Sequence, residues 1–358
     1  MEWKGIGGKN MKRQMRKLVA LVSAGVLAVS LAAGCGNAST SGEKDSSKES
    51  KVSKVIIGTQ EMPNDEGIAK ALDYFSEEMG VEVELKQFDS GKDVVTALAS
   101  DSIDFGLLGS CPASLAISQG VDVKCIWIHE VLGSVESLVA REDTGITSVD
   151  QLKGKNVATP FASTAHFSVL HSLEKAGLSE SDVNLLDMQP SEIYAAWQNG
   201  QIDAAYVWEP TLSEMENSVV LCTSEDMAEA GYMTSNVELV RTKFMEENPE
   251  LVEGYIRALN KAVEMYQENN DEAVATIAKA LELSTEDAKG QMSGSTWLNA
   301  KEQLAAEYFG TNDAKGALAQ NLYDTATFLK EQGSITEVPD LSVFEEAADS
   351  SAIEAVAK

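Results

Sequence analysis

The stretch Val157-Ala158-Thr159-Pro160-Phe161-Ala162-Ser163-Thr164-Ala165-His166 decides the fold that we expect. It starts as an apolar strand after a turn signal at 154–156. Ser163 and Thr164 then precede residues with helical spacing, at positions 167, 170, 173 and 176. A hydroxyl just before a helix typically caps it, and the free N–H groups there can also bind a small anion. The stretch therefore predicts a strand-to-helix turn that either caps a helix or holds an anion.

Strands and helices alternate on both sides of this turn. Strand-like runs are expected at 55–58, 81–85, 103–108, 121–128 and 135–140, and after the turn at 183–186, 202–207, 219–221 and 237–240. From residue 242 onward the pattern is nearly all helical. Such alternation predicts an α/β protein with parallel sheets. We expect two α/β units joined by two crossings, with a cleft between them.

Small polar residues follow predicted strands at three points: Thr59-Gln60, Gly109-Ser110-Cys111 and Ser163-Thr164. In open α/β sheets, ligands bind at the carboxyl ends of strands, next to helix starts. No one of the three turns is specific, but together they predict a ligand site in the cleft.

The N-terminal segment has the pattern of an export signal. A basic stretch, Met11 to Lys17, precedes an apolar run at 18–33 that is short for a membrane span. Leu31-Ala32-Ala33-Gly34-Cys35 resembles the bacterial lipobox, which implies cleavage before Cys35 and a lipid on its sulfur. The alternative is an ordinary secretory signal with a chance cysteine. We predict a lipoprotein signal peptide at 1–34, and a lipidated Cys35 with a flexible tether at 35–53.

Charge and cysteine content exclude several classes of function. The formal net charge of −29, read as dispersed surface acid, argues against binding to nucleic acid or anionic lipid. Cys111, Cys125 and Cys222 allow at most one disulfide. His166 and His171 are five residues apart, which does not place them on one helix face as a ligand pair. We predict no metal site and no cofactor.

Several stretches resemble the taurine-binding proteins of bacterial ABC importers, within the nitrate, sulfonate and taurine substrate-binding family. They are Lys86 to Gly91, Ala97 to Ser100, Leu108 to Ser110, Thr159 to His166, Ala195 to Gln198 and Ile202 to Pro210. The similarity runs from about Lys54 to Gly333. It implies an extracytoplasmic lipoprotein with a two-lobed type II periplasmic-binding-protein fold. That protein would be a monomer that delivers taurine or a related aliphatic sulfonate to an ABC permease.

Other members of that fold family keep alternatives open. The ligand could be nitrate or a precursor of the thiamin pyrimidine, or the chain could be the enzyme that makes this pyrimidine. An enzyme would need a reactive group in the cleft, and Cys111 at a predicted helix start is the candidate nucleophile. A surface lipoprotein without a ligand is the third class. We predict a binding protein and not an enzyme.

The resemblance also implies domain limits and roles for residues. Lobe 1 is expected at 54–138 and 237–340, lobe 2 at 139–236, and an acidic, Ala-rich tail at 341–358. Ser110, Ser163, Thr164 and His166 are the expected sulfonate donors, because hydroxyls and helix-start N–H groups suit a sulfonate. Gln60 and Cys111 stand at the other strand-to-helix turns.

The amine end of taurine needs an acid or an aromatic face. Trp208 could wall the pocket or pack in the core, and Glu136 and Glu209 are the acids expected near the crossings. Asn236 stands where well-matched taurine binders have an acid. Either the amine contact has moved, or the ligand is a sulfonate without an amine.

Overall fold

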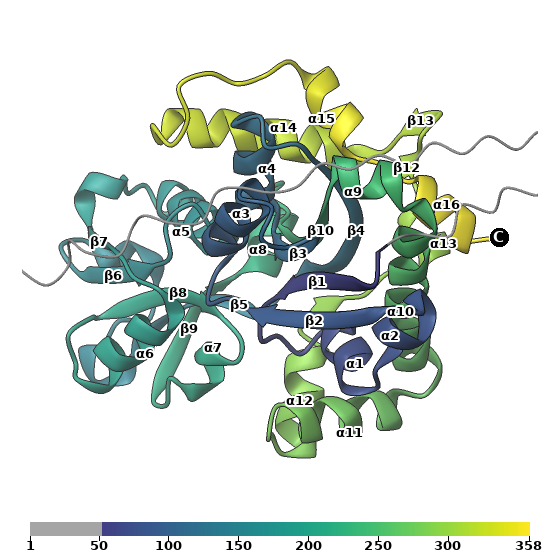
Figure 1. The fold of residues 1–358 in the computed structure, drawn as a ribbon. Coiled ribbons are helices and arrows are strands. Elements are labelled where there is room, and N and C mark those ends of the chain that lie inside the picture. The colour runs from purple at the N-terminus through teal and green to yellow at the C-terminus, as the bar shows by residue number, and fades with distance from the viewer. Residues whose placement is uncertain (1–51) are drawn as a thin grey trace, which may run out of the picture. The chain divides into compact units, whose positions relative to one another are not determined.

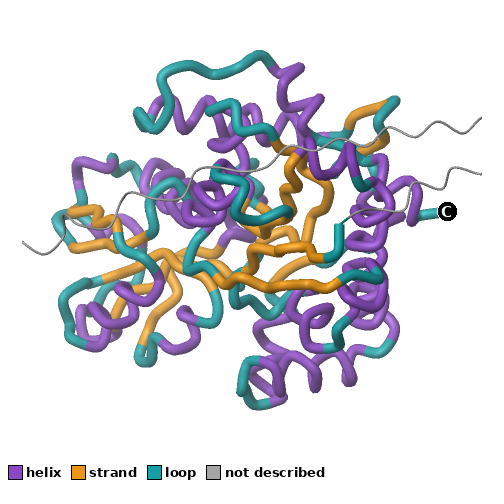
Figure 2. Tube along the Cα trace, viewed as in Figure 1, coloured by secondary structure: helices purple, strands orange, loops and turns teal. Residues whose placement is uncertain are grey.

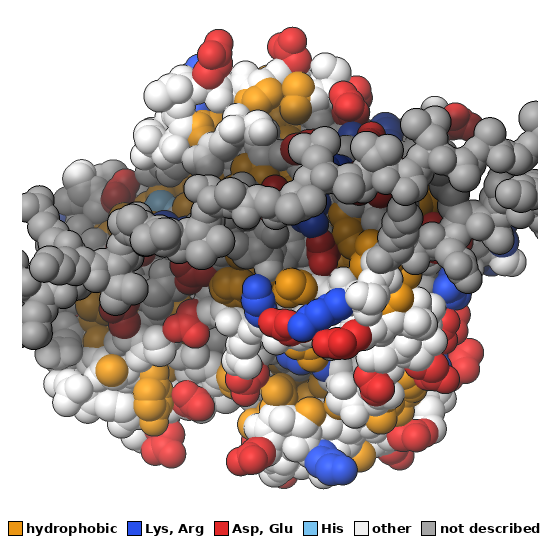
Figure 3. All heavy atoms as spheres, viewed as in Figure 1, with side chains coloured by type: hydrophobic (Ala, Val, Ile, Leu, Met, Phe, Trp, Pro, Cys, Tyr) orange, Lys and Arg blue, Asp and Glu red, His pale blue; other side chains and the backbone are white. Residues whose placement is uncertain are grey.

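The computed structural model describes residues 52–358, which form two β-sheets with helices packed around them (Figures 1 and 2). The predicted signal peptide, the lipidated Cys35 and the tether up to residue 51 lie outside the described residues. None of the helices in 52–358 is both long enough and apolar enough to span a membrane. On the face drawn in Figure 3, acidic side chains are scattered rather than gathered into one patch.

The first sheet has six strands in the order β11-β4-β10-β3-β1-β2. Strand β1 is parallel to β2 and β3, whereas β10 is antiparallel to β3 and β4. Strand β10 corresponds to the strand predicted at 237–240, and it returns the chain to the first sheet after the strands of the second. The strand bounds are β1 (Lys54–Thr59), β2 (Glu82–Gln87), β3 (Phe105–Gly109), β4 (Val123–Leu132), β10 (Ser235–Arg241) and β11 (Ser295–Thr296).

The second sheet has five strands in the order β7-β6-β8-β5-β9. Strand β6 is parallel to β7 and β8, and β5 is antiparallel to β8 and β9. In each sheet four strands run in the same direction, so the expectation of mostly parallel sheets is confirmed; the antiparallel strands are β10 and β11 in the first sheet and β5 in the second. The strand bounds are β5 (Glu136–Arg141), β6 (Asn156–Thr159), β7 (Asn184–Asp187), β8 (Ala204–Trp208) and β9 (Ser218–Thr223).

The chain enters the second sheet earlier than the boundary predicted at 138/139. Strand β5 begins at Glu136, which pairs with Trp208 of β8, so residues 136–138 belong to the five-stranded sheet. The return crossing lies at 230–234, between the end of α8 and the start of β10. The first crossing, at 133–135, is short because β4 runs on to Leu132.

Most helices flank the six-stranded sheet, and four lie within the segment that forms the five-stranded sheet (Figure 1). The four are α5 (Thr164–Lys175), α6 (Pro190–Gln198), α7 (Thr211–Glu214) and α8 (Ser224–Glu229), with short 3-10 helices at Glu142–Thr144, Val149–Leu152 and Glu180–Asp182. The others are α1 (Asp65–Ala71), α2 (Tyr74–Met79), α3 (Gly91–Ala99), α4 (Ser110–Ser118), α9 (Thr242–Glu247), α10 (Pro249–Glu268), α11 (Asn270–Ala280), α12 (Thr285–Met292), α13 (Ala300–Gln303), α14 (Ala317–Glu331), α15 (Leu341–Ala347) and α16 (Ser351–Val356). A hairpin of β12 (Gly310–Thr311) and β13 (Ala314–Lys315) precedes α14.

Helix α10 shows why the predicted helical tail folds onto the first sheet. Its apolar positions recur every three or four residues, and Leu251, Tyr255 and Leu259 are all buried. The Tyr255 ring stacks on Phe75 and on Phe105, with centroids 4.9 and 4.3 Å apart. One helix face thus joins α2 and β3 into a single core.

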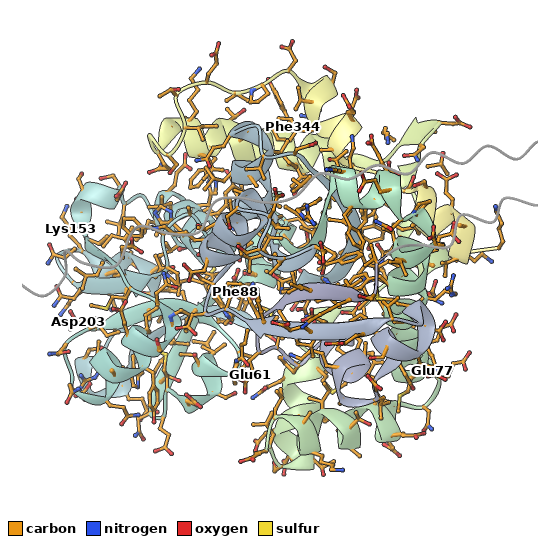
Figure 4. All side chains as sticks on the ribbon, viewed as in Figure 1. Glu61, Glu77, Phe88, Lys153, Asp203 and Phe344 are labelled. Atoms are coloured by element: carbon orange, nitrogen blue, oxygen red, sulfur yellow. The ribbon has the colours of Figure 1, made fainter. Side chains whose placement is uncertain are left out.

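The segment at 341–358 is part of this fold and not an appended tail. It forms α15 and α16, which pack against β4. Phe344 of α15, labelled in Figure 4, and Ile353 of α16 are fully buried. The same packing buries Ala347, Ala348 and Ala352.

Candidate functional site: a cavity between the two sheets

A cavity of about 20 Å³ lies between the two sheets. A cavity of this size holds about one water molecule. Residues of both sheet units line it, namely Gln60, Met62, Gly91, Gly109, Pro112, Leu132, Glu136, Ser163, Thr164, Trp208 and Asn236. The structure therefore brings together six of the predicted site residues: Gln60, Glu136, Ser163, Thr164, Trp208 and Asn236.

A groove of about 300 Å³ adjoins the cavity. Gln60 and Trp208 line both spaces, so these two side chains stand at the boundary between them. Phe88 and Glu61, which also line the groove, lie near the middle of the view in Figure 4. Trp208 is half-buried. It lines the cavity and the groove, and it also packs against the hydrophobic core.

Two helix starts meet at the cavity. Ser163 is the N-cap of α5, and its Oγ accepts the His166 N–H at 3.1 Å and donates to the Pro160 carbonyl at 2.5 Å. The predicted capping role is confirmed. Helix α4 starts opposite, after Gly109, where a Cβ atom would lie only 2.8 Å from Cγ2 of Thr164. A glycine at 109 is what allows the two helix starts to approach each other.

Glu136 is the acid of the cavity wall. It lies on β5, is 1% exposed, and accepts hydrogen bonds from Thr164 Oγ1 at 2.5 Å and Ser224 Oγ at 2.8 Å. Burial raises its pKa to about 7, although the two hydroxyls oppose the rise. The Thr164 hydroxyl is therefore turned toward a carboxylate in this structure.

Two amide side chains complete the polar wall. The Nδ2 of Asn236 donates to Glu130 Oε1 at 2.8 Å and contacts Met62 Sδ at 3.4 Å. The Nε2 of Gln60 donates to the Leu107 carbonyl at 3.0 Å. In both side chains the amide nitrogen is held by the protein, which leaves the carbonyl oxygen for the cavity.

Sequence reasoning missed Glu130, which supports Asn236 from behind the cavity wall. Its carboxylate is 3% exposed and lies on β4 directly across from Asn236 on β10. A signal was present in the sequence, since His129 and Glu130 are polar residues between the apolar runs 125–128 and 131–132. Buried polar residues in such a strand need partners nearby.

Four predicted site residues are absent from the lining of this cavity. His166 stacks on Phe161 at 4.4 Å, and its Nδ1 accepts the Ala162 N–H at 3.3 Å. Burial lowers its pKa to about 4, so the ring is neutral near pH 7. Ser110 Oγ accepts the Ser235 N–H at 3.4 Å, a contact within the six-stranded unit.

Glu209 and Cys111 complete these four residues. Glu209 accepts the N–H and the hydroxyl of Ser213 at 3.0 and 2.8 Å, so its carboxylate is hydrogen-bonded to the start of α7. Burial and the charge of Glu136 raise the pKa of Cys111 well above its usual value. This is the opposite of the shift expected for a thiol at a helix start, because the thiol is fully enclosed. Cys111, Cys125 and Cys222 are all free thiols.

Comparisons with known proteins agree on one family. A family model described as NMT1/THI5 like matches residues 67–273. The chain is 34% identical over 291 residues to the taurine-binding periplasmic protein of Escherichia coli (strain K12), covering 79% of this chain and 88% of that protein.

Two solved structures share the fold. The periplasmic aliphatic sulphonate binding protein SsuA from Escherichia coli has a TM-score of 0.65 at 22% identity, over 82% of this chain and 92% of that one. The alkanesulfonate-binding protein SsuA from Xanthomonas axonopodis pv. citri, bound to MOPS, has a TM-score of 0.69 at 21% identity, over 84% and 99%. The predicted two-lobed α/β binding-protein fold is confirmed.

Proposed function

Because the chain belongs to the NMT1/THI5-like family, we propose that it is the extracytoplasmic substrate-binding protein of an ABC importer. Its ligand is taurine or a related small aliphatic sulfonate, bound between the two sheets at the cavity, which widens when the two sheet units move apart. The observation that carries this proposal is the cavity itself, which places helix starts and a buried acid within one small space.

The helix starts suit the sulfonate end. The first N–H groups of a helix have no partner within it, so those of Thr164 and Ala165 remain for a ligand. The positive end of the helix dipole favours an anion there. Because the protein is strongly acidic overall, short-range donors of this kind must hold the sulfonate.

Glu136 suits the ammonium end. An ammonium group offers three donors, and the buried carboxylate has two acceptor oxygens at the cavity. On binding, the ammonium replaces the Thr164 hydroxyl at Glu136, and the freed hydroxyl donates to a sulfonate oxygen. The exchange leaves both charged ends of the ligand with hydrogen-bonded partners.

A calorimetric panel tests the ligand class. Taurine, isethionate, methanesulfonate, nitrate, sulfate and a pyrimidine precursor are titrated into the protein lacking residues 1–34. Sulfonates should bind and the other solutes should not. Binding of nitrate or the pyrimidine with no sulfonate response rejects the proposal, and conversion of any ligand to a product identifies an enzyme.

Ligand entry requires the two sheet units to move apart, because the cavity has room for only about one water. The crossings at 133–135 and 230–234 are the proposed hinges between the lobes. Solution scattering with and without saturating ligand tests this: the radius of gyration should fall on binding, because the ligand favours the closed form. An unchanged radius alongside tight binding rejects the two-lobe motion.

Membrane attachment through a lipid on Cys35 is part of the proposal. The apolar run before Cys35 and the small residues next to it support this assignment. Cys35→Ala should release the protein into the soluble fraction. If the variant stays with the membrane, a retained apolar segment provides the anchor.

A further inference from the structure

We propose that Glu130 is a positioning residue that orients the amide of Asn236, and that the oriented amide makes the cavity prefer a ligand with an ammonium end. The inference deepens the proposed function and rests on it. Asn236 lines the cavity, whereas Glu130 lies behind it. The two residues face each other across the β10–β4 pair, where side chains of opposed residues are close enough to interact.

The orientation of the Asn236 amide follows from its two neighbours. Glu130 Oε1 lies 2.8 Å from the amide nitrogen, and Met62 Sδ lies 3.4 Å from the same nitrogen. A carboxylate and a thioether sulfur both accept hydrogen bonds. Turning the amide over would put its oxygen against two acceptors. The nitrogen is thus held by both, and Oδ1 is the polar atom left for a ligand.

A chain of hydrogen bonds fixes Glu130 as an acceptor. The indole N–H of Trp297 can only donate, and it donates to Ser295 Oγ at 3.0 Å. The Ser295 hydroxyl is therefore free to donate onward to Glu130 Oε2 at 2.6 Å. The amide nitrogen of Asn236 donates to the other oxygen, Oε1, so both carboxylate oxygens of Glu130 accept hydrogen bonds.

Asn64 adds a longer contact, 3.5 Å from its Nδ2 to Glu130 Oε1, which also points a donor at the carboxylate. Burial raises the pKa of Glu130, while the hydrogen bonds from Ser295 and Asn236 oppose that rise. Hydrogen bonds therefore converge on Glu130, from Trp297 through Ser295 on one side and from the Asn236 amide nitrogen on the other. Because the Asn236 nitrogen faces Glu130, its Oδ1 is the acceptor left for the cavity.

An acceptor at this position discriminates between sulfonates. The ammonium of taurine is a donor with no acceptor capacity, so it matches Oδ1 and cannot match an amide N–H. The hydroxyl of isethionate can donate or accept, so it tolerates either orientation of Asn236. An alkyl end matches neither, and leaves the carbonyl without a partner. Asn236 thus replaces the expected acid with a neutral acceptor whose direction is set by Glu130.

The test uses Glu130→Gln, which keeps the shape and lets position 130 donate to Asn236, so that the amide turns over. Calorimetry should show taurine affinity falling on the order of tenfold, with isethionate changing less than about threefold. Glu130→Gln combined with Asn236→Asp should restore the taurine preference, because a carboxylate at 236 accepts in either orientation. Glu209→Gln, a buried acid outside the cavity lining, is the matched control and should leave both affinities unchanged.

Each outcome decides the inference. Equal loss for both ligands, no loss for either, or failure of the double variant to restore the preference overturns it. Circular dichroism melting of each variant shows whether it is folded. If Glu130→Gln is unfolded, Asn236→Leu decides: it removes the oriented acceptor and should lose the taurine preference. If the wild-type protein binds neither sulfonate, the proposed function fails and the inference falls with it.

Discussion

The cavity wall around Glu136 and the start of α7 around Glu209 place two similar acids in different surroundings. Both side chains are buried, both accept hydrogen bonds from hydroxyls, and burial raises the pKa of each to about 7. Glu136 also lines the cavity between the sheets, next to Thr164. Glu209 instead lies just before α7 and accepts twice from Ser213 of that helix. A perturbed pKa alone therefore does not mark a binding residue, since burial produces it in both places.

The largest effect is expected for Glu136→Gln. Removing the charge leaves the ligand ammonium without its ion partner, so taurine affinity should fall on the order of a hundredfold. Isethionate, which has no ammonium, should lose less than about threefold. Titration calorimetry measures both. Glu209→Gln should leave both affinities unchanged. A comparable loss of taurine affinity in this variant would mean that Glu209 binds the ammonium group.

Thr164→Val should give the next largest effect. The variant keeps the side-chain shape and removes the hydroxyl that the proposed exchange turns toward the sulfonate. Taurine and isethionate should each weaken about tenfold, because both carry the sulfonate. Calorimetry on the two ligands is again the measurement. A loss confined to taurine would show that Thr164 acts through Glu136 and does not contact the sulfonate.

The pH dependence of taurine binding should follow Glu136. Its pKa of about 7 means that the free protein holds a proton on this carboxyl below neutral pH. Binding an ammonium releases that proton, so taurine affinity should fall by about tenfold per pH unit below 7. Isethionate affinity should not fall in this range. Glu136→Gln should abolish the slope, and persistence of the slope in that variant would assign it to another group.

The smallest effect concerns stability and Glu209. Its folded-state pKa of about 7 lies above the ordinary value, so between about pH 4.5 and 7 the folded protein keeps a proton that the unfolded chain has released. This contribution to stability is present at low pH and is lost as pH rises through that window. Glu209→Gln should therefore raise Tm by about 2–4 °C at pH 8 relative to wild type, and less at pH 5. Thermal melts at both values check it, and an equal shift at each pH would exclude titration of Glu209 as the cause.

Local chemistry explains which parts of the site could be predicted from sequence. The cap at Ser163 follows from a hydroxyl before a helical repeat, and the burial of α10 follows from its apolar spacing. The predicted order of strands and helices is confirmed, because each strand or helix depends mainly on residues that are neighbours along the chain. His166 could not be placed this way, because the stacking ring of Phe161 and the surrounding helices decide which way it faces.

By itself, the sequence determined the α/β order, the helix starts and the residues available at each strand end. Only the tertiary structure decided that Glu136 faces the cavity while Glu209 does not, and that Glu130 stands behind Asn236. The start of β5 at Glu136, and the approach of Gly109 to Thr164, likewise depend on packing between segments distant in sequence. The physical reason is that propensity and periodicity act over a few residues, whereas burial and hydrogen-bond partners are set by whatever the fold brings alongside.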